Sequence, residues 1–100
     1  MSNFAITPSS LPDVKIIQPR TFEDDRGFFL ETYSQPALLQ GGIDITFIQD
    51  NHSLSTQTGT LRGLHFQRPP FAQDKLVRVV RGRIWDVAVD MRRSSPTFGK

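Results

Sequence analysis

The amino-acid sequence predicts an all-β fold, a sandwich or a barrel, built as a single domain over residues 1–100. Short segments rich in β-branched and aromatic residues recur about every 8 to 12 residues, separated by glycine, proline or acidic residues. The clearest pair of strands is 75–80 with 83–90, because Arg81-Gly82 between them can form the tight turn of a hairpin. A chain of this length is close to the smallest that buries a self-sufficient core.

The first third of the chain predicts two strands and the segments around them. Residues 1–12 contain two prolines and three serines, and we expect a loose lead-in there. A first strand is expected over 13–18, ended by Pro19. Acidic residues before a glycine predict a turn at 22–27, and the aromatic-rich run 27–33 is expected to form the next strand.

One short helix is predicted, near residues 35–40. Ser34 can cap its N-terminus, and Pro36 suits its first turn, where a missing N–H costs nothing. Gly41-Gly42 then ends it, because glycine readily adopts the backbone conformations that close a helix.

A polar strand face is predicted in the middle of the chain. Residues 43–55 read as one long strand, followed by a turn at 57–59, a strand at 60–66 and a loop forced by prolines at 68–70. In the second half of the long strand, the residues on one face all carry hydrogen-bonding side chains: Gln49, Asn51, Ser53 and Ser55. A buried face of this polarity is unusual, so we interpret it as a ligand-binding face.

Composition excludes several classes of protein. There is no cysteine, which excludes disulfides and thiolate metal sites, and no apolar run reaches the roughly 18 residues of a membrane span. The first ten residues do not resemble a signal peptide, so we expect a cytoplasmic protein. Because the net charge is only +2, with acidic residues among the basic ones, a small anionic ligand is favoured over nucleic acid.

The candidate chemical centre is the stretch 59–67, which contains His65. A histidine exchanges protons near neutral pH, and Arg62 and Lys75 on either side could clamp a diphosphate or stabilise an enolate oxygen. Strict alternation puts Arg62 and His65 on opposite faces of a strand, so a bend at Gly63 is required to bring them to one cavity.

Simpler interpretations stay open for each of these residues. His65 can be a structural histidine, and Arg62 and Lys75 can be solvated surface charges. Arg26 can pair within its own turn, where an exposed ion pair contributes little. A metal site would need about three converging ligands, whereas the sequence has only His52 and His65 as imidazoles, so we expect no metal.

Five segments taken together resemble the dTDP-4-dehydrorhamnose 3,5-epimerase family. The central one is Gly59-Thr60-Leu61-Arg62-Gly63-Leu64-His65-Phe66-Gln67. The others follow the family order with compatible spacing: 25–31, 49–53, 73–77 and 82–92.

The resemblance implies a cupin-like jelly roll that forms a homodimer by strand exchange and uses no metal or cofactor. Members convert dTDP-4-dehydro-6-deoxy-D-glucose to dTDP-4-dehydro-L-rhamnose, on the route to dTDP-L-rhamnose. His65 matches the family's catalytic base. Lys75 matches one of its substrate contacts, and its charge is suited to stabilise the enolate oxygen. The positions that match further substrate contacts are Arg26, Glu31, Gln49, Asn51 and Arg62.

The chain departs from the family pattern in length. Members run to nearly twice 100 residues, and their proton-donating tyrosine and the aspartate that orients the base lie beyond the position of Lys100. Tyr33, the single tyrosine, is in the wrong part of the chain to be that donor. We therefore expect an N-terminal fragment or a truncated gene product with weak or absent epimerisation, in which partial binding of the nucleotide sugar survives. The alternatives are a catalytically impaired cupin that binds a dTDP-sugar, a related 3- or 5-epimerase or ketoisomerase, and a purely structural β-domain.

Overall fold

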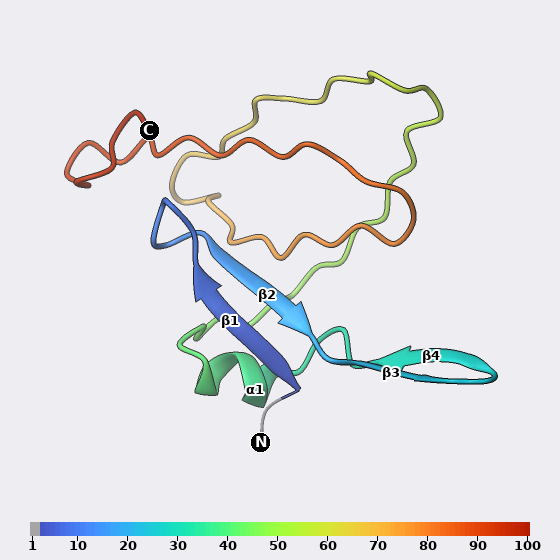
Figure 1. Ribbon diagram of the computed structural model, residues 1–100. Coiled ribbons are helices and arrows are strands. Elements are labelled where there is room, and N and C mark those ends of the chain that lie inside the picture. Colours follow the sequence, from blue (N-terminus) through green and yellow to red (C-terminus); the bar gives the residue numbers. More distant parts are fainter. Residues whose placement is uncertain (1–2) are drawn as a thin grey trace.

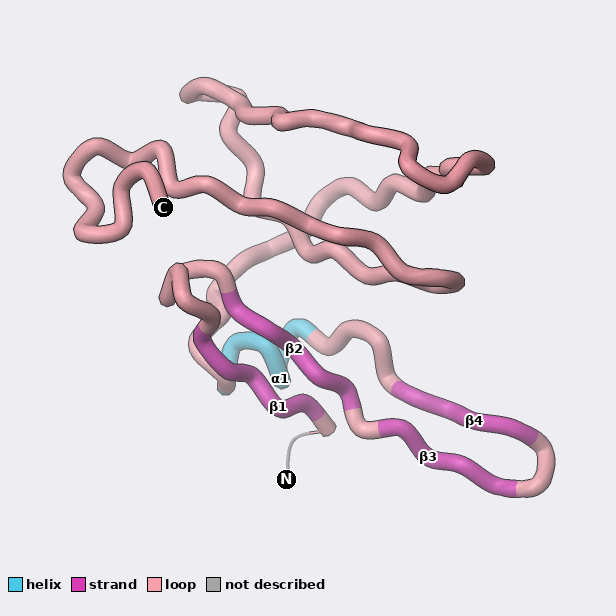
Figure 2. Tube along the Cα trace, turned by 45° about the horizontal axis from the view of Figure 1, so that its top comes forward, coloured by secondary structure: helices cyan, strands magenta, loops and turns pink. Residues whose placement is uncertain are grey.

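The structure, a computed structural model, describes residues 3–100, and its regular elements all lie in the first part of the chain (Figure 1). Two antiparallel hairpins and one helix follow one another in sequence, and each hairpin is a separate two-stranded sheet (Figure 2). The elements are β1 (Phe4–Pro8), β2 (Lys15–Pro19), β3 (Thr21–Asp24), β4 (Gly27–Leu30) and α1 (Gln35–Gln40).

The first hairpin corrects the expectation of a loose lead-in. Phe4–Pro8 forms β1 and pairs with β2 in a register that sets Ile6 opposite Ile17, because β-branched side chains suit a pleated strand. The connecting loop is closed by Ser9, whose hydroxyl donates to the Leu11 carbonyl and accepts from the Leu11 N–H. The expectation for Met1 and Ser2 falls outside the described residues. The strand expected at 13–18 is present as β2, two residues later at its start.

Helix α1 forms as the sequence predicts. The Ser34 hydroxyl accepts a hydrogen bond from the Ala37 N–H at 3.3 Å, Pro36 lies in the first turn, and Gly42 has a φ of +93°. Leu38 is buried, and a methyl group added to Gly41 would overlap the Ile6 side chain, so the end of α1 packs closely on β1. With six residues, this helix is far too short to span a bilayer, and no other helix in residues 3–100 could do so.

The second hairpin extends away from the rest of the chain (Figure 1). Its register sets Asp24 opposite Gly27, so the loop is only Asp25-Arg26, shorter than the expected turn at 22–27. Its second strand also ends earlier than expected, at Leu30, because the chain leaves the pair to enter the cap of α1.

Beyond α1 the backbone is extended but unpaired. The strands expected over 43–55, 60–66, 75–80 and 83–90 do not form: the described residues after Gln40 contain no strand. Gly82 has the positive φ expected of the turn, +84°, yet the two arms are not joined by a hydrogen-bonded ladder. Side-chain alternation specifies an extended backbone, whereas a ladder also requires a neighbouring strand in register.

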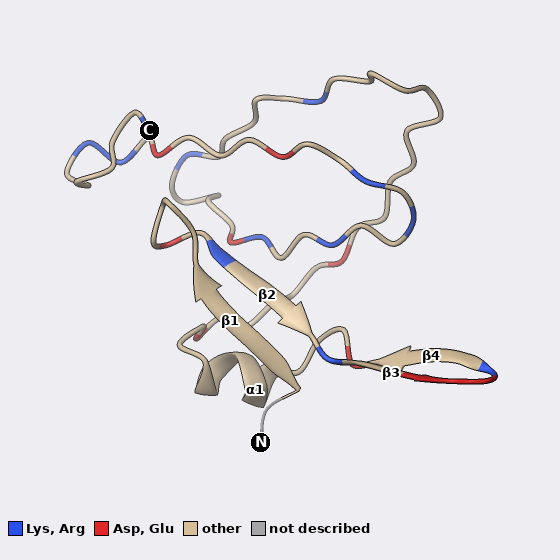
Figure 3. Cartoon of the chain, in the orientation of Figure 1, with Lys and Arg blue, Asp and Glu red and all other residues tan. Residues whose placement is uncertain are grey.

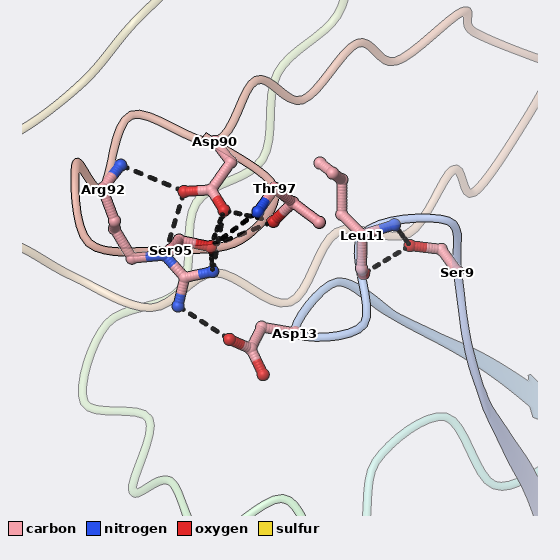
Figure 4. A network of polar contacts seen from close by, with 7 residues as sticks. All are labelled: Ser9, Leu11, Asp13, Asp90, Arg92, Ser95 and Thr97. Carbon is pink, nitrogen blue, oxygen red and sulfur yellow. Dashed lines mark hydrogen bonds and ion pairs between the residues drawn. The ribbon is translucent and has the colours of Figure 1, made fainter. Parts of the chain in front are cut away.

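A buried carboxylate ties the last residues to the first hairpin (Figure 4). The Asp90 side chain is 3% exposed and accepts hydrogen bonds from Arg92, Ser95 and Thr97. The guanidinium of Arg92 also reaches Asp13 in the β1–β2 loop, at 2.7 Å. One arginine therefore joins two segments that are far apart in the sequence.

The Ser34→Ala substitution should destabilise the fold by about 1 kcal/mol, because α1 is too short to lose its only side-chain cap without fraying. The free energy of unfolding in urea measures this loss. Ser34→Asp is the matched control, since its carboxylate can accept the same hydrogen bond, and an equal loss in both variants would contradict the capping role.

The network around Asp90 should make stability depend on acid. Hydrogen bonds to the Asp90 carboxylate hold its pKa far below its ordinary value. The one from Arg92 has the largest effect, and those from Ser95 and Thr97 come next. In the unfolded chain the pKa returns to about 3.9. The stabilisation is thus complete above about pH 4 and is lost progressively as the pH falls below it. Urea unfolding from pH 3 to 7 should show this loss in the parent chain and a flatter profile, with lower stability at pH 7, in Asp90→Asn.

Asp24→Asn is the control for that series. The pKa of Asp24 is also lowered by a hydrogen bond from Arg26, but this pair is exposed at the tip of the second hairpin and contributes little. An Asp24→Asn profile as flat as that of Asp90→Asn would show that the Asp90 network is not the origin of the acid sensitivity.

Candidate functional site

The candidate residues lie in two separate parts of the molecule. Arg26 is in the loop between β3 and β4, and Glu31 follows β4 directly. The remaining candidates lie in the extended region after α1: Gln49, Asn51, Arg62, His65 and Lys75. Since the second hairpin projects away from this region in both views, one chain does not gather all the candidates around one point (Figures 1 and 2).

The backbone bends at Gly63, between Arg62 and His65. Gly63 has a φ of +111°, which a strand of L-residues does not adopt, so the regular alternation is interrupted where the sequence predicts a bend. The His65 ring folds back towards this glycine, and Nδ1 lies 3.2 Å from the point that a Cβ atom would occupy on residue 63. That the bend turns Arg62 and His65 into one cavity stays a prediction.

Arg62 is held against the polar segment that precedes it. Its Nε donates to the Ser55 hydroxyl at 3.0 Å, and its Nη2 donates to the Leu54 carbonyl at 3.3 Å. Ser55 belongs to the predicted ligand-binding face, on which the Gln49 amide also donates to Asn51 at 3.4 Å. A guanidinium has five N–H donors, so this anchorage orients Arg62 and leaves further donors for an anion.

Arg26 forms the ion pair that the simpler interpretation of its sequence expects. Its guanidinium binds Asp24 at 2.6 Å, which raises the pKa of Arg26 and lowers that of Asp24. The Arg26 side chain is 90% exposed, however, so an anionic ligand can compete for it at little cost.

The structure adds aromatic residues to the surroundings of Arg26. A surface pocket of about 480 Å³ beside the second hairpin is lined by Arg26 together with Phe22, Phe28 and Phe29. Phe28 and Phe29 are 73% and 72% exposed, although paired phenylalanines in a strand ordinarily indicate core. Glu31 lines a second pocket, of about 440 Å³, beside α1. The first pocket is formed within the second hairpin alone, whereas the second also depends on the placement of α1.

His65 and Lys75 are exposed and, among residues 3–100, have no hydrogen-bond or ion-pair partner. Nothing in this part of the chain orients the imidazole by a hydrogen bond. Over the same residues, no three histidine or carboxylate side chains are grouped to hold a metal ion. The extended region carries both acidic and basic residues, and its longest run of one sign is basic, Lys75, Arg78, Arg81 and Arg83 (Figure 3).

Comparison with known proteins assigns the family. A family model described as dTDP-4-dehydrorhamnose 3,5-epimerase matches residues 8–100. The chain belongs to this family. The resemblance found in the sequence motifs is therefore confirmed.

Individual members of this epimerase family match nearly the whole chain. The dTDP-4-dehydrorhamnose 3,5-epimerase of Shigella flexneri is 53% identical over 96 residues, which are 95% of this chain and 52% of that protein. The enzyme of Methanothermobacter thermautotrophicus is 47% identical over 100 residues, 100% of this chain and 53% of that protein. This member of the family thus spans about half the length of these relatives.

A solved structure confirms the fold class. The crystal structure of dTDP-4-dehydrorhamnose 3,5-epimerase from Bacillus anthracis, with TDP and PPi bound, superposes with a TM-score of 0.93 at 47% identity. The match covers 97% of this chain and 55% of that one. The chain therefore follows the backbone path of an all-β, cupin-like epimerase even where its extended segments lack paired neighbours.

The Ser55→Ala substitution should release Arg62. We expect the Arg62 Nε–H signal in ¹⁵N–¹H NMR spectra to move towards the position of a solvated guanidinium and to exchange faster with water. Ser53→Ala is the matched control, because Ser53 is on the same predicted face but does not contact Arg62. Equal responses in the two variants would contradict the anchoring role of Ser55.

Proposed function

We propose that this chain supplies the proton-abstracting and phosphate-binding part of an enzyme that converts dTDP-4-dehydro-6-deoxy-D-glucose to dTDP-4-dehydro-L-rhamnose. The observation that carries the proposal is the match to the epimerase family over residues 8–100. Bound TDP in the Bacillus anthracis structure supports a thymidine diphosphate sugar as the ligand. We also propose a cytoplasmic enzyme, as for other reactions on nucleotide sugars in solution.

His65 is the proposed base. The C4 ketone of the substrate acidifies the hydrogens on C3 and C5, and a neutral imidazole near neutral pH can remove them. The negative charge then develops on the ketone oxygen. Lys75, which has no competing ion pair in residues 3–100, and the oriented guanidinium of Arg62 are suited to stabilise it.

Inversion also requires an acid on the opposite face of the sugar, and Tyr33 is not suited to be that acid. Tyr33 is the single tyrosine of the chain, and its ring packs edge-on against Phe47, with centroids 5.8 Å apart. This contact ties Tyr33 to the segment next to α1. The proton donor is therefore expected from polypeptide that corresponds to the other half of the relatives.

We further propose that Arg26 and Glu31 serve the site of a second copy in a homodimer. Their hairpin projects away from the segment of the same chain that carries His65, and exposed phenylalanines line the pocket beside Arg26. Exchange of this hairpin between two copies would cover those rings and bring Arg26 to the phosphates bound by Arg62. Gln49 and Asn51 would complete the substrate contacts.

A nucleotide-sugar binding protein with little turnover is the second candidate. The observation that favours it is the absence, in residues 3–100, of any hydrogen bond that orients the His65 imidazole. A related 3- or 5-epimerase or ketoisomerase would use the same base and differ in the proton donor.

Solvent exchange tests the proposal. The chain is incubated with dTDP-4-dehydro-6-deoxy-D-glucose in deuterated water, and the C3 and C5 proton signals are followed by NMR. Exchange should occur in the parent chain, persist in His52→Ala and fall at least about a hundredfold in His65→Ala, in line with the loss of a general base.

The outcomes separate the candidates. Exchange without inversion would establish the base and assign the missing step to the proton donor. A folded chain that binds TDP but shows no exchange would overturn the catalytic proposal and leave the binding protein. A folded chain that neither binds nor exchanges would leave only a structural role.

A further inference from the structure

The missing side chain of Gly63 faces the imidazole of His65. A Cβ atom built on Gly63 would lie 3.2 Å from His65 Nδ1, 3.4 Å from its backbone nitrogen and 3.6 Å from its Cε1. A separation of 3.2 Å is tighter than an ordinary van der Waals contact, so either the ring or the backbone would have to move. The His65 Nε2 atom is not among these three nearest atoms, so Nδ1 is the ring nitrogen that lies closer to Gly63.

This arrangement distinguishes Gly63 from the other glycines with positive φ. At each of the others, no atom lies within 4 Å of the position that a Cβ atom would occupy, so a side chain there would extend into open space. They are Gly27, Gly42, Gly59, Gly82 and Gly99. At those positions glycine is favoured only because of the positive φ. At Gly63, φ is +111° and an added Cβ would in addition lie against the side chain of His65.

We propose that Gly63 is a positioning residue for His65. Because Gly63 has no side chain, the Nδ1 side of the imidazole can lie close to the backbone. In this orientation Nε2 is available to the substrate hydrogen. The exposed His65 ring has no hydrogen-bond partner in residues 3–100, so the backbone at Gly63 is the neighbour on which this proposal rests. The role of Nε2 rests on the proposed function; the contact itself does not.

The Gly63→Ala substitution tests the inference, with Gly82→Ala as the matched control, because Gly82 lies outside the stretch 59–67. Both glycines have positive φ, +111° and +84°, so both substitutions strain the backbone, but only the first adds an atom against His65. In ¹³C–¹H NMR spectra of the full chain, the Cε1–H signal of His65 should shift in Gly63→Ala and stay in place in Gly82→Ala. The signal of His52 should stay in place in both, and the His65→Ala spectrum assigns the two histidines.

Turnover provides a second readout. The rate of C3 and C5 hydrogen exchange should fall severalfold in Gly63→Ala, because the imidazole must give way by a few tenths of an ångström, less than the 1 Å misplacement that costs roughly a hundredfold. It should change little in Gly82→Ala. Unchanged exchange in a folded Gly63→Ala chain would overturn the positioning role. If the parent chain shows no exchange, the proposed function fails, while the NMR shift still decides the inference on Gly63.

A double-mutant cycle keeps the test decisive if Gly63→Ala proves unstable. The destabilisation by Gly63→Ala is measured by urea unfolding in the parent chain and in the His65→Ala background. A clash with the ring predicts a smaller destabilisation once the ring is absent, including recovery of a fold lost in the single variant. Equal destabilisation in both backgrounds, or an unfolded chain in both, would assign the whole effect to backbone strain and overturn the inference.

Discussion

Extended backbone needs hydrogen-bond partners, and among residues 3–100 a ladder forms only within the β1–β2 and β3–β4 hairpins. After α1, the chain follows the path of a cupin-like epimerase without adjacent strands of its own to pair with. Its apolar side chains are exposed in consequence: Trp85 is 93% exposed and Leu61 is 88% exposed. Pairing with further polypeptide would bury these side chains and satisfy the backbone together.

Polar side chains join separate segments of the described chain. The buried Asp90 carboxylate organises the last residues, and Arg92 carries the link onward to Asp13 in the first hairpin. A second such link joins Arg62 to Ser55 at the predicted binding face. Because charge-assisted hydrogen bonds are directional, they hold these segments in place with little help from an apolar core.

The same constraint explains the division of the candidate site. Arg62, His65 and Lys75 belong to the extended region, while Arg26 is at the tip of a hairpin that extends away from it. This separation fits the proposal that a second copy of the chain completes the site. Within the extended region, Gly63 has no side chain, and the His65 ring lies close to the space that a Cβ atom would occupy.

The sequence by itself determined the features that depend on a few neighbouring residues, and the tertiary structure decided those that depend on distant ones. The cap at Ser34, the bend at Gly63 and the family motifs around His65 could all be read from local order, because backbone preferences act over short range. Strand pairing in β1, the link from Arg92 to Asp13 and the exposure of aromatic residues on the second hairpin could not. Each of these depends on which distant residues come into contact in the folded chain, and the local sequence does not specify those contacts.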